Sequence, residues 1–281
     1  MSNKYVLALA GMLCIALCGY TQEDTTFKKT LGEIVISVNK WEQKLNEVPN
    51  KIVKINKLDI LRNNPQTSAD LLSQTGAVFV QKSQLGGGSP MIRGFATNRV
   101  LLVVDGVRMN NAIYRSGNLQ NVISIDALST ETAEVIFGPG SLIYGSDAIG
   151  GVMDFHTLDA RFSKDKKMQV RGSVLSRYST ANKENTIHAD INLGWKKWSV
   201  LSSFSYSKFD DLKMGENGGQ DNYLRPEYVE IVNNTDNIVQ NSDPRIQRFS
   251  GYNQTNFLQK IRFKPNENWD LQYSFTYAKT G

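Results

Sequence analysis

The chain has 281 residues, a formal net charge of +5 and a sequence isoelectric point near 9.0. Its basic residues are scattered, which argues against a nucleic-acid-binding surface. Histidine occurs only at His156 and His188, and no nucleophile has a base beside it in the sequence. We therefore expect no enzyme, no resident metal and no cofactor.

The N-terminus has the pattern of a secretory signal. Lys4 precedes an apolar run from Val6 to Leu17, which is too short to cross a bilayer comfortably. Both cysteines, Cys14 and Cys18, lie in this segment. Residues 1–18 are predicted to be a signal peptide, and the exported chain would then have no disulfide. Lipidation of Cys18 is less favoured, because Leu17 is bulky where such signals prefer a small residue.

Residues 19–40 form a polar segment that is predicted to be flexible and ends in a short β-prone stretch, "EIVISV" (Glu33 to Val38). From residue 41 to 158, strand-like and helix-like pieces alternate. Residues 67–75 have a helical period with a Thr/Ser cap, and Gly76 suits the end of that helix. "RVLLVVDG" is typical of a buried strand that ends in an Asp105-Gly106 turn. The pattern predicts a small mixed α/β domain.

After about Met168 the apolar period changes to two, which predicts β-strands with one apolar and one polar face. Five strands of about ten residues are predicted in residues 166–281. Aromatic residues gather at their ends, as the interfacial belt of a transmembrane barrel requires. They are Tyr178, Trp195, Trp198, Tyr206, Trp269 and Tyr277. Short turns also alternate with longer connections, so a membrane barrel is favoured over a soluble β-sandwich.

The glycine-rich stretches do not fit nucleotide-binding loops. "LGGGS" has no Lys-Ser/Thr after it, and Gly138, Gly140 and Gly145 are one residue off the dinucleotide spacing. Asp105 has no second carboxylate or histidine nearby in the sequence, so a turn residue is a better interpretation than a catalytic or metal-binding one.

Two stretches carry a family resemblance. "SPMIRGFATNRVLLVVDGVRMN", followed by "EVIFGPGSLIYGSDAIGGVMDF", resembles the plug domain of TonB-dependent outer-membrane receptors in order and spacing. The resemblance implies an α+β plug domain at 41–158, followed by the first antiparallel strands of a transmembrane β-barrel of 22 strands. Five strands in 114 residues (168–281) give about 23 residues per strand, so a full barrel needs about 500 residues. We therefore expect an N-terminal fragment of a longer receptor.

The resemblance also implies site residues. Glu33, Ile34, Val35, Ile36 and Ser37 resemble the TonB box, which pairs as an added strand with the energising partner; an ordinary first plug strand is the alternative. The box follows the signal closely, so no N-terminal signalling or carboxypeptidase-like extension is expected. Arg93, Arg99 and Arg108 are expected to anchor the plug to barrel carboxylates. The expected ligand-facing apical loops contain Ser83, Gln84, Leu85, Ser89, Met109, Asn110, Asn111, Tyr114 and Arg115.

The implied function is active import of a scarce, bulky nutrient across the outer membrane of a Gram-negative cell. The expected partners are a TonB-type energising protein, outer-membrane lipid, and a small iron-containing or cobalamin-like ligand, with a haem protein as a further candidate. Within this family, the sequence most resembles the haem/haemoglobin receptors. These often bind haem iron through a histidine of the plug, but the predicted apical loop here has no histidine and contains Tyr114 as the candidate iron ligand. Haem, a ferric siderophore and cobalamin stay open. The alternatives are a passive porin or adhesin, or a soluble exported β-sandwich binding protein.

Overall fold

A computed structural model describes residues 34–35, 43–44, 48–82, 86–96, 99–109, 120–165, 167–215 and 224–281. The chain divides into two units, Met1–Glu33 and Ile34–Gly281, and every described residue belongs to the second unit. Within the described ranges, no helix is long and apolar enough to cross a membrane. The predicted signal peptide at 1–18 lies outside the described residues.

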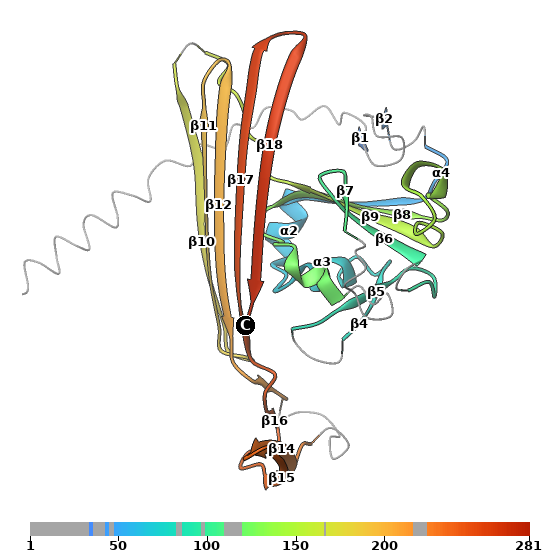
Figure 1. Cartoon of the computed structure of the whole chain (residues 1–281), viewed down its shortest axis with the longest axis vertical. Coiled ribbons are helices and arrows are strands. Elements are labelled where there is room, and N and C mark those ends of the chain that lie inside the picture. The colour runs from blue at the N-terminus through green and yellow to red at the C-terminus, as the bar shows by residue number, and fades with distance from the viewer. Residues whose placement is uncertain are drawn as a thin grey trace, which may run out of the picture. The chain divides into compact units, whose positions relative to one another are not determined.

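The N-terminal domain is built on a five-stranded sheet with the order β3-β8-β9-β6-β7. Its strands are β3 (Ile52–Asn56), β6 (Val100–Val104), β7 (Val107–Arg108), β8 (Thr130–Phe137) and β9 (Gly151–Thr157). Strands β6 and β9 are parallel, and the other pairs are antiparallel. Short helices complete the domain, together with a small ribbon of β4 (Phe79–Gln81) and β5 (Ser89–Met91) (Figure 1). Those within the described residues include α2 (Lys57–Asn63), α3 (Ser68–Ser73), the 3-10 helix η4 (Gln120–Ser124) and α4 (Ser141–Tyr144).

Helix α3 begins where the sequence predicts it. The hydroxyl oxygen of Thr67 accepts a hydrogen bond from the Asp70 backbone N–H at 3.2 Å. The Asp70 carboxylate accepts one from the Thr67 backbone N–H at 3.1 Å. This reciprocal capping satisfies two backbone donors at the helix start. The predicted N-terminal cap is therefore confirmed. At the other end the C-cap is Gln74 in a right-handed helical conformation, and Gly76 follows two residues later with φ +66°.

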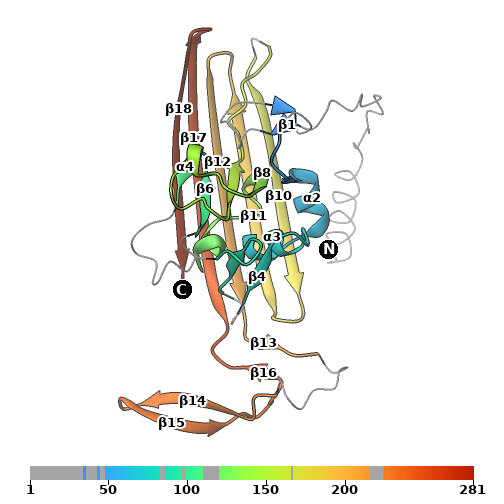
Figure 2. The ribbon, with the colours of Figure 1, turned by 90° about the vertical axis from the view of Figure 1, so that its right-hand side faces the viewer.

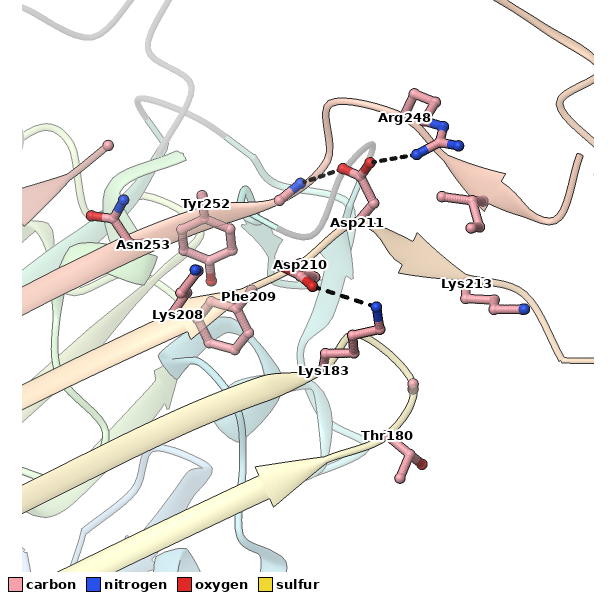
Figure 3. A pocket seen from close by; sticks show the side chains of 14 residues that line it. Thr180, Lys183, Lys208, Phe209, Asp210, Asp211, Lys213, Arg248, Tyr252 and Asn253 are labelled. Carbon is pink, nitrogen blue, oxygen red and sulfur yellow. Dashed lines mark hydrogen bonds and ion pairs between the residues drawn. The ribbon is translucent and has the colours of Figure 1, made fainter. Parts of the chain in front are cut away.

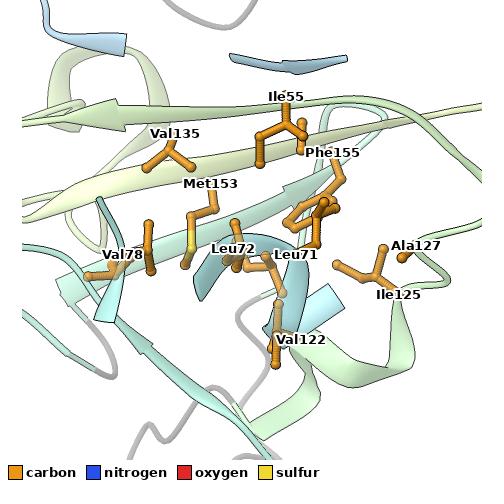
Figure 4. Packing of buried hydrophobic residues seen from close by; sticks show 14 of the residues in the cluster. Ile55, Leu71, Leu72, Val78, Val122, Ile125, Ala127, Val135, Met153 and Phe155 are labelled. Atoms are coloured by element: carbon orange, nitrogen blue, oxygen red, sulfur yellow. The ribbon is translucent and has the colours of Figure 1, made fainter. Parts of the chain in front are cut away.

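The main hydrophobic core lies between one face of the sheet and helices α3 and η4. Leu71 and Leu72 of α3 lie close to Met153 and Phe155 of β9, and none of these four side chains is more than 1% exposed (Figure 4). The predicted buried strand is also confirmed, because Val100–Val103 are 0–1% exposed. The opposite face of the sheet carries a second cluster. It contains Val35, Val48, Ile52, Leu101, Val103, Ile136, Tyr144, Ala148 and Val152.

The C-terminal half forms one antiparallel sheet with the order β10-β11-β12-β17-β18. Its strands are β10 (Gln169–Ser179), β11 (Glu184–Gly194), β12 (Trp198–Phe209), β17 (Tyr252–Asn266) and β18 (Trp269–Thr280). We call it the long-strand sheet. The five predicted strands are therefore confirmed, and in this chain β10 and β18 are its outer strands.

The long connection between β12 and β17 has strands of its own. It contains β13 (Leu212–Lys213) paired with β16 (Ile246–Gln247), and a hairpin of β14 (Glu227–Val232) with β15 (Thr235–Gln240). Sequence periodicity predicted a long loop here. The structure adds two small ribbons to it.

The two faces of the long-strand sheet differ sharply. The N-terminal domain contacts one face, which we call inward (Figures 1 and 2). On β11 the inward residues Thr186, His188 and Asn192 are buried. The outward residues Ile187 and Ile191 are 50% and 46% exposed. Alternate residues point to opposite faces of a strand, so the predicted alternation is confirmed, with the polar face covered by protein.

Candidate functional site between the N-terminal domain and the long strands

Asp126 is the centre of the contact between the N-terminal domain and the long-strand sheet. It lies in the connection between η4 and β8. One carboxylate oxygen, Oδ2, accepts hydrogen bonds from the hydroxyls of Ser129 and Ser205, each at 2.5 Å. The other accepts one from the Leu128 backbone N–H at 2.9 Å. Ser205 belongs to β12, so the single carboxylate of Asp126 links the turn after η4 to the long-strand sheet.

Further polar side chains surround this carboxylate. The hydroxyls of Ser129 and Ser203 are 2.9 Å apart, which adds a second link to β12. His188 of β11 contacts the Ser205 hydroxyl through Nδ1 at 2.7 Å. Its Nε2 lies 3.4 Å from the carboxylate of Asp190. Ser205, His188 and Asp190 lie together, but the Ser205 hydroxyl donates its proton to Asp126. It is therefore held as a structural donor rather than as a nucleophile.

Lys57 of α2 lies on the domain side of this contact. Its ammonium group donates hydrogen bonds to the backbone carbonyl oxygens of Leu128 and, at 3.3 Å, Thr130. Burial lowers the pKa of Lys57, and the carboxylates of Asp126, Glu131 and Asp190 oppose that shift. Lys57 thus fixes the turn that carries Asp126 and Ser129.

A second link joins β17 to the turn after β6. Lys260, whose side chain is 1% exposed, places Nζ 3.1 Å from Asp105 Oδ2 and 3.3 Å from the carbonyl oxygen of Thr157. Asp105 also accepts hydrogen bonds from the Thr157 N–H at 2.9 Å and the Thr157 hydroxyl at 2.6 Å. Asp105 and Gly106 have φ +48° and +81°, as a tight β-hairpin turn requires. The predicted turn is confirmed, and its aspartate has a second contact that the sequence did not reveal.

A third link lies beside helices α2 and α3. Arg177 of β10 pairs with Glu184 of β11 at 2.6 Å, and both side chains are almost fully buried. The same guanidinium donates to Asn64 Oδ1 and to the Pro65 carbonyl, both at 2.9 Å. Gln66 donates to the other Glu184 oxygen at 2.6 Å. The buried charges are thus paired and also hydrogen-bonded to the domain, which is the arrangement that burial of charge requires.

A cavity of about 590 Å³ separates the N-terminal domain from β17 and β18. On the domain side it is lined by Asp105, Met109 and Asp126, and on the strand side by polar residues that include Gln272 and Ser274. It opens between the Asp126 and Lys260 links. The contact is therefore a set of polar links beside an open space, together with one small apolar cluster of Leu158, Ala160, Leu201 and Leu258.

The predicted TonB box is described only at Ile34 and Val35. These two residues form β1, which pairs with β2 (Gln43–Lys44). The side chain of Val35 is 1% exposed and belongs to the second cluster of the N-terminal domain. Glu33, Ile36 and Ser37 lie outside the described residues. The role of this segment stays a prediction.

Two buried carboxylates lie in the same layer as Val35. Glu134 and Asp154 are register partners on β8 and β9 and are 1% and 4% exposed. The Tyr144 hydroxyl donates to Asp154 Oδ2 at 3.2 Å, and Asp154 Oδ1 has no hydrogen-bond partner among the described residues. Burial raises the pKa of Asp154 to about 6, while nearby His156 and the Tyr144 hydrogen bond lower it. Burial also raises the pKa of Tyr144.

Most of the predicted apical loop residues fall outside the described part of the chain. These are Ser83, Gln84, Leu85, Asn110, Asn111, Tyr114 and Arg115. Ser89 begins β5 (Ser89–Met91), which pairs with β4 (Phe79–Gln81). The Met109 backbone N–H donates to the Leu102 carbonyl at 2.8 Å, and its side chain lines the 590 Å³ cavity. Their contact with a ligand stays a prediction.

The predicted anchoring arginines make different contacts. The guanidinium of Arg93 lies 5.3 Å from the Phe137 ring centre, within the N-terminal domain. Arg108 donates to the Tyr144 carbonyl at 3.3 Å, and Arg99 lies next to β6 and is exposed. Their pairing with barrel carboxylates stays a prediction. The side chains of the N-terminal domain that contact the five described long strands include Asp126, Ser129, Gln66 and Asp105. The domain's partners on the strands include two cations, Arg177 and Lys260. For Lys260, the available signal in the sequence was a lysine at an inward position of a predicted strand.

The outward face of the long-strand sheet is suited to lipid. Its exposed apolar side chains include Val174, Ile187, Ile191, Phe204 and Phe275. On β12 the band extends from Trp198 to Tyr206, a length of about 26 Å along the strand at about 3.3 Å per residue. At the 35–45° tilt of barrel strands this is a height of about 20 Å, close to the apolar band of about 25 Å that aromatic residues border in an outer-membrane barrel. The soluble sandwich does not fit, because no second sheet packs on this face in the part of the chain that the structure describes.

Comparison with known proteins agrees with this geometry. Residues 44–152 match the family model described as "TonB-dependent Receptor Plug Domain". A "Vitamin B12 transporter BtuB" from Vibrio vulnificus is 34% identical over 225 residues, which cover 77% of this chain and 34% of that protein. A "Hemin receptor" from Yersinia pestis is 29% identical over 141 residues, which cover 50% of this chain and 20% of that protein. The chain thus spans about a third or less of the length of these relatives.

Solved structures share the fold. The Pseudomonas aeruginosa FpvA structure with bound heterologous pyoverdine has a TM-score of 0.65 at 12% identity and covers 88% of this chain and 27% of that one. The siderophore receptor PirA from Acinetobacter baumannii has a TM-score of 0.56 at 17% identity, with 82% of this chain and 31% of that one covered. In these alignments the N-terminal domain and the long-strand sheet match together.

Proposed function

Because this chain belongs to the TonB-dependent outer-membrane receptors and carries their plug domain with antiparallel strands of their barrel, we propose that it serves the active import of a scarce, bulky nutrient. Its location is the outer membrane of a Gram-negative cell. The family consists of transporters and receptors, so we infer that the chain binds and moves its ligand and does no covalent chemistry on it. From here the N-terminal domain is called the plug domain.

The observation that supports import is the nature of the contact between plug domain and wall. A plug held by a large apolar interface would be costly to displace, because apolar burial contributes about 25 cal/mol per Å². Here polar links at Asp126, Lys260 and Glu184, with one small apolar cluster around Leu201 and Leu258, hold the domain beside a 590 Å³ cavity. Hydrogen bonds to charged groups contribute a net of about 1.5–3 kcal/mol each, because water replaces them when they break. This contact suits a domain that rearranges while the wall stays intact.

The segment around Ile34 and Val35 is the proposed point of energy input. In the resting state β1 pairs with β2, and Val35 is buried in the second cluster. Among the described residues, β1 and β2 share two residue pairs. An extended segment held in this way can be exchanged for pairing with a partner strand. Pulling on this segment would act directly on the cluster that also contains Tyr144 and Val152.

We propose haem or a ferric siderophore as the ligand, with cobalamin as the third candidate. The similar proteins include a vitamin B12 transporter, a hemin receptor and a siderophore receptor. Competition for uptake among haem, a ferric siderophore and cobalamin in cells that carry the full receptor separates them. Uptake of one labelled compound should depend on the receptor and be suppressed only by its own unlabelled form.

Collapse of the proton gradient tests import against a passive pore. Cells with the receptor should bind the labelled ligand before and after addition of a protonophore. Uptake should stop after the addition, because strand pairing with the energising partner can no longer deliver work. Uptake that continues unchanged would support the porin alternative, and binding without any energised uptake would support the adhesin alternative.

A further inference from the structure

The start of strand β17 contacts the plug domain at two successive inward positions, Tyr252 and Gln254. The two residues are two apart on one strand, so their side chains point to the same face, about 7 Å from each other along the strand. Gln254 is 6% exposed, and Tyr252 is half-buried. These positions are separate from the links at Asp126, Lys260 and Glu184, so they form a further contact between the long-strand sheet and the plug domain.

Tyr252 contacts the glycine run Gly86–Gly88, which belongs to the first predicted apical loop. A Cβ atom on Gly86 would lie 3.2 Å from Cδ1 of the Tyr252 ring. The ring can approach the backbone this closely because residue 86 has no side chain. On the plug side, a Cβ atom on Gly88 would lie 2.6 Å from Cβ of Ala69 in helix α3. The glycine run is therefore held between β17 and α3.

The Tyr252 ring is itself held in place. It stacks on the ring of Phe209 in β12, with 4.6 Å between the ring centres (Figure 3). The backbone just before it is fixed by Asp211, whose Oδ1 accepts hydrogen bonds from the N–H groups of Ser250 at 2.9 Å and Gly251 at 3.0 Å. Because both the ring and the preceding backbone have fixed partners, Tyr252 gives the glycine run a firm surface to pack on.

Gln254 contacts the plug domain next to the second predicted apical loop, the one that contains Met109. Its side-chain amide donates a hydrogen bond to the carbonyl oxygen of Ile123 at 2.7 Å. Ile123 belongs to η4, the first described element after that loop. The same amide nitrogen lies 3.2 Å from Asn256 Oδ1, which orients it. The hydrogen bond to Ile123 is buried, so water does not compete for it in the folded receptor.

We propose that Tyr252 and Gln254 are positioning residues of the nutrient-binding site, which set the spacing of the two apical loops from a single strand. Gly86 and Ile123 are 37 residues apart in the sequence (123 − 86), but their contacts on β17 are two residues apart. A bulky ligand that touches both loops binds more tightly when their spacing is already fixed, because binding then does not have to order them. The inference rests on the proposed function, since it takes these loops to face the ligand.

The test uses the full receptor in detergent and two readouts. The first is hydrogen exchange of the backbone in residues 86–91 and 122–125, without ligand. The second is equilibrium binding of three probes, haemin, ferrichrome and cyanocobalamin, of which the one that the parent binds most tightly is followed in the variants. Exchange reports the position of the loops directly, so it decides on the contact even if the parent binds none of the probes.

Each substitution should loosen its own loop. Gln254→Leu removes one hydrogen bond, which corresponds to about a fivefold change in an equilibrium constant, so exchange in residues 122–125 should rise about fivefold. Tyr252→Leu removes the ring and its stacking on Phe209, and exchange in residues 86–91 should rise by about the same factor. Probe binding should weaken about fivefold in each single variant. Tyr252→Phe keeps the ring and should match the parent in both readouts.

Two outward residues of β17 provide matched controls, Gln259→Leu and Phe263→Leu. Gln259 donates to the Leu201 carbonyl at 2.9 Å, and the Phe263 ring stacks on Trp198 with 4.1 Å between centres. Each control therefore removes the same kind of contact from the same strand, on the face away from the plug domain. Both should keep the exchange and the probe binding of the parent within about twofold.

The outcomes separate this inference from import. Unchanged exchange in Tyr252→Leu and Gln254→Leu, equal changes in the two controls, or equal loosening in Tyr252→Phe would overturn the contact. Loosened loops with parental probe binding would overturn the positioning role. A receptor whose probe binding responds as expected, but which never accumulates the probe in energised cells, would refute the proposed import and leave the positioning role standing.

Discussion

Lys260 of the wall strand β17 and Asp105 of the plug turn form an ion pair with a separation of 3.1 Å. The lysine side chain is 1% exposed, and its aspartate partner is 22% exposed. Asp105 also holds the end of β9 through Thr157, so one carboxylate joins a plug turn, a plug strand and the barrel wall. Since a buried cation must be paired, this link is where removal of one partner should have the greatest effect on plug attachment.

Replacement of Lys260 by methionine should therefore weaken the plug domain within the receptor. Removal of one partner from a buried pair costs about 3–5 kcal/mol, and the partial exposure of Asp105 favours the lower limit. Urea unfolding of the plug, followed by protease susceptibility, measures this loss. The double variant with Asp105→Asn should lose less than the sum of the two single changes. Exposed Lys197→Met is the control, and an equal loss in it would contradict the role of the pair.

Asp154→Asn should stabilise the plug domain in a pH-dependent way. The pKa of Asp154 is raised to about 6 from an ordinary value of 3.8, so between these limits the folded state holds a proton that the unfolded state has released. Stability of the parent therefore falls as pH rises from about 4 to 6, by up to about 3 kcal/mol. Asparagine keeps an acceptor for the Tyr144 hydroxyl without the charge. The variant should match the parent near pH 4 and exceed it at pH 7, whereas a pH-independent difference would contradict burial of the charged form.

Cysteines at Ser129 and Ser203 should form a disulfide between plug and wall. The two hydroxyl oxygens are 2.9 Å apart, so the side chains already point at each other. The only native cysteines are Cys14 and Cys18, in the predicted signal peptide. Oxidation should give a cross-linked product that reduction reverses, seen as a mobility shift after cleavage between the two domains. Ser202 is the adjacent residue on the outward face, so the pair Ser129→Cys with Ser202→Cys should remain reduced; cross-linking of both pairs would refute the assigned register.

A charge introduced on the outward face of β11 should destabilise the folded receptor more when it lies deeper in the apolar band. Ile191→Lys places an ammonium group in the middle of the apolar band, where a lysine on the lipid face costs about 2–4 kcal/mol. Asn185→Lys places the same group at the rim of the same strand and face, where the cost is about 0–1 kcal/mol. Folding of the full receptor into lipid vesicles, titrated with urea, measures both. Equal costs at the two positions would argue against a membrane-spanning sheet.

Sequence patterns were sufficient for much of the fold. The period-two alternation around Ile187 and Ile191 predicted both the strand and its two faces, because alternation is a local property of a strand. Thr67 likewise marked the start of α3 through local capping chemistry, whereas the helix ends at Ser73, before Gly76. The plug motifs gave the family resemblance because their glycines and charged turns recur in a fixed order along the chain.

Links between plug and wall were harder to predict. Ser129 and Ser203 are 74 residues apart, and Lys260 is 155 residues from Asp105 (260 − 105). Nothing local marks such a pair, because each residue alone fits an ordinary surface position. The anchoring role was instead predicted for Arg93, Arg99 and Arg108, because these arginines lie within the recognisable plug motifs. The contact with the described strands instead uses aspartate, serine and amide groups of the plug, with Lys260 and Arg177 among their wall partners.

Deletion of Glu33–Ser37 in the full receptor is the most direct test of energised import. Radiolabelled ligand is measured twice on the same cells, as ligand bound at 0 °C and as ligand accumulated at growth temperature. The account predicts nearly unchanged binding, because the external surface of the plug is intact, and loss of accumulation to the level of receptor-free cells. Accumulation at the parental rate in the deletion variant would contradict it.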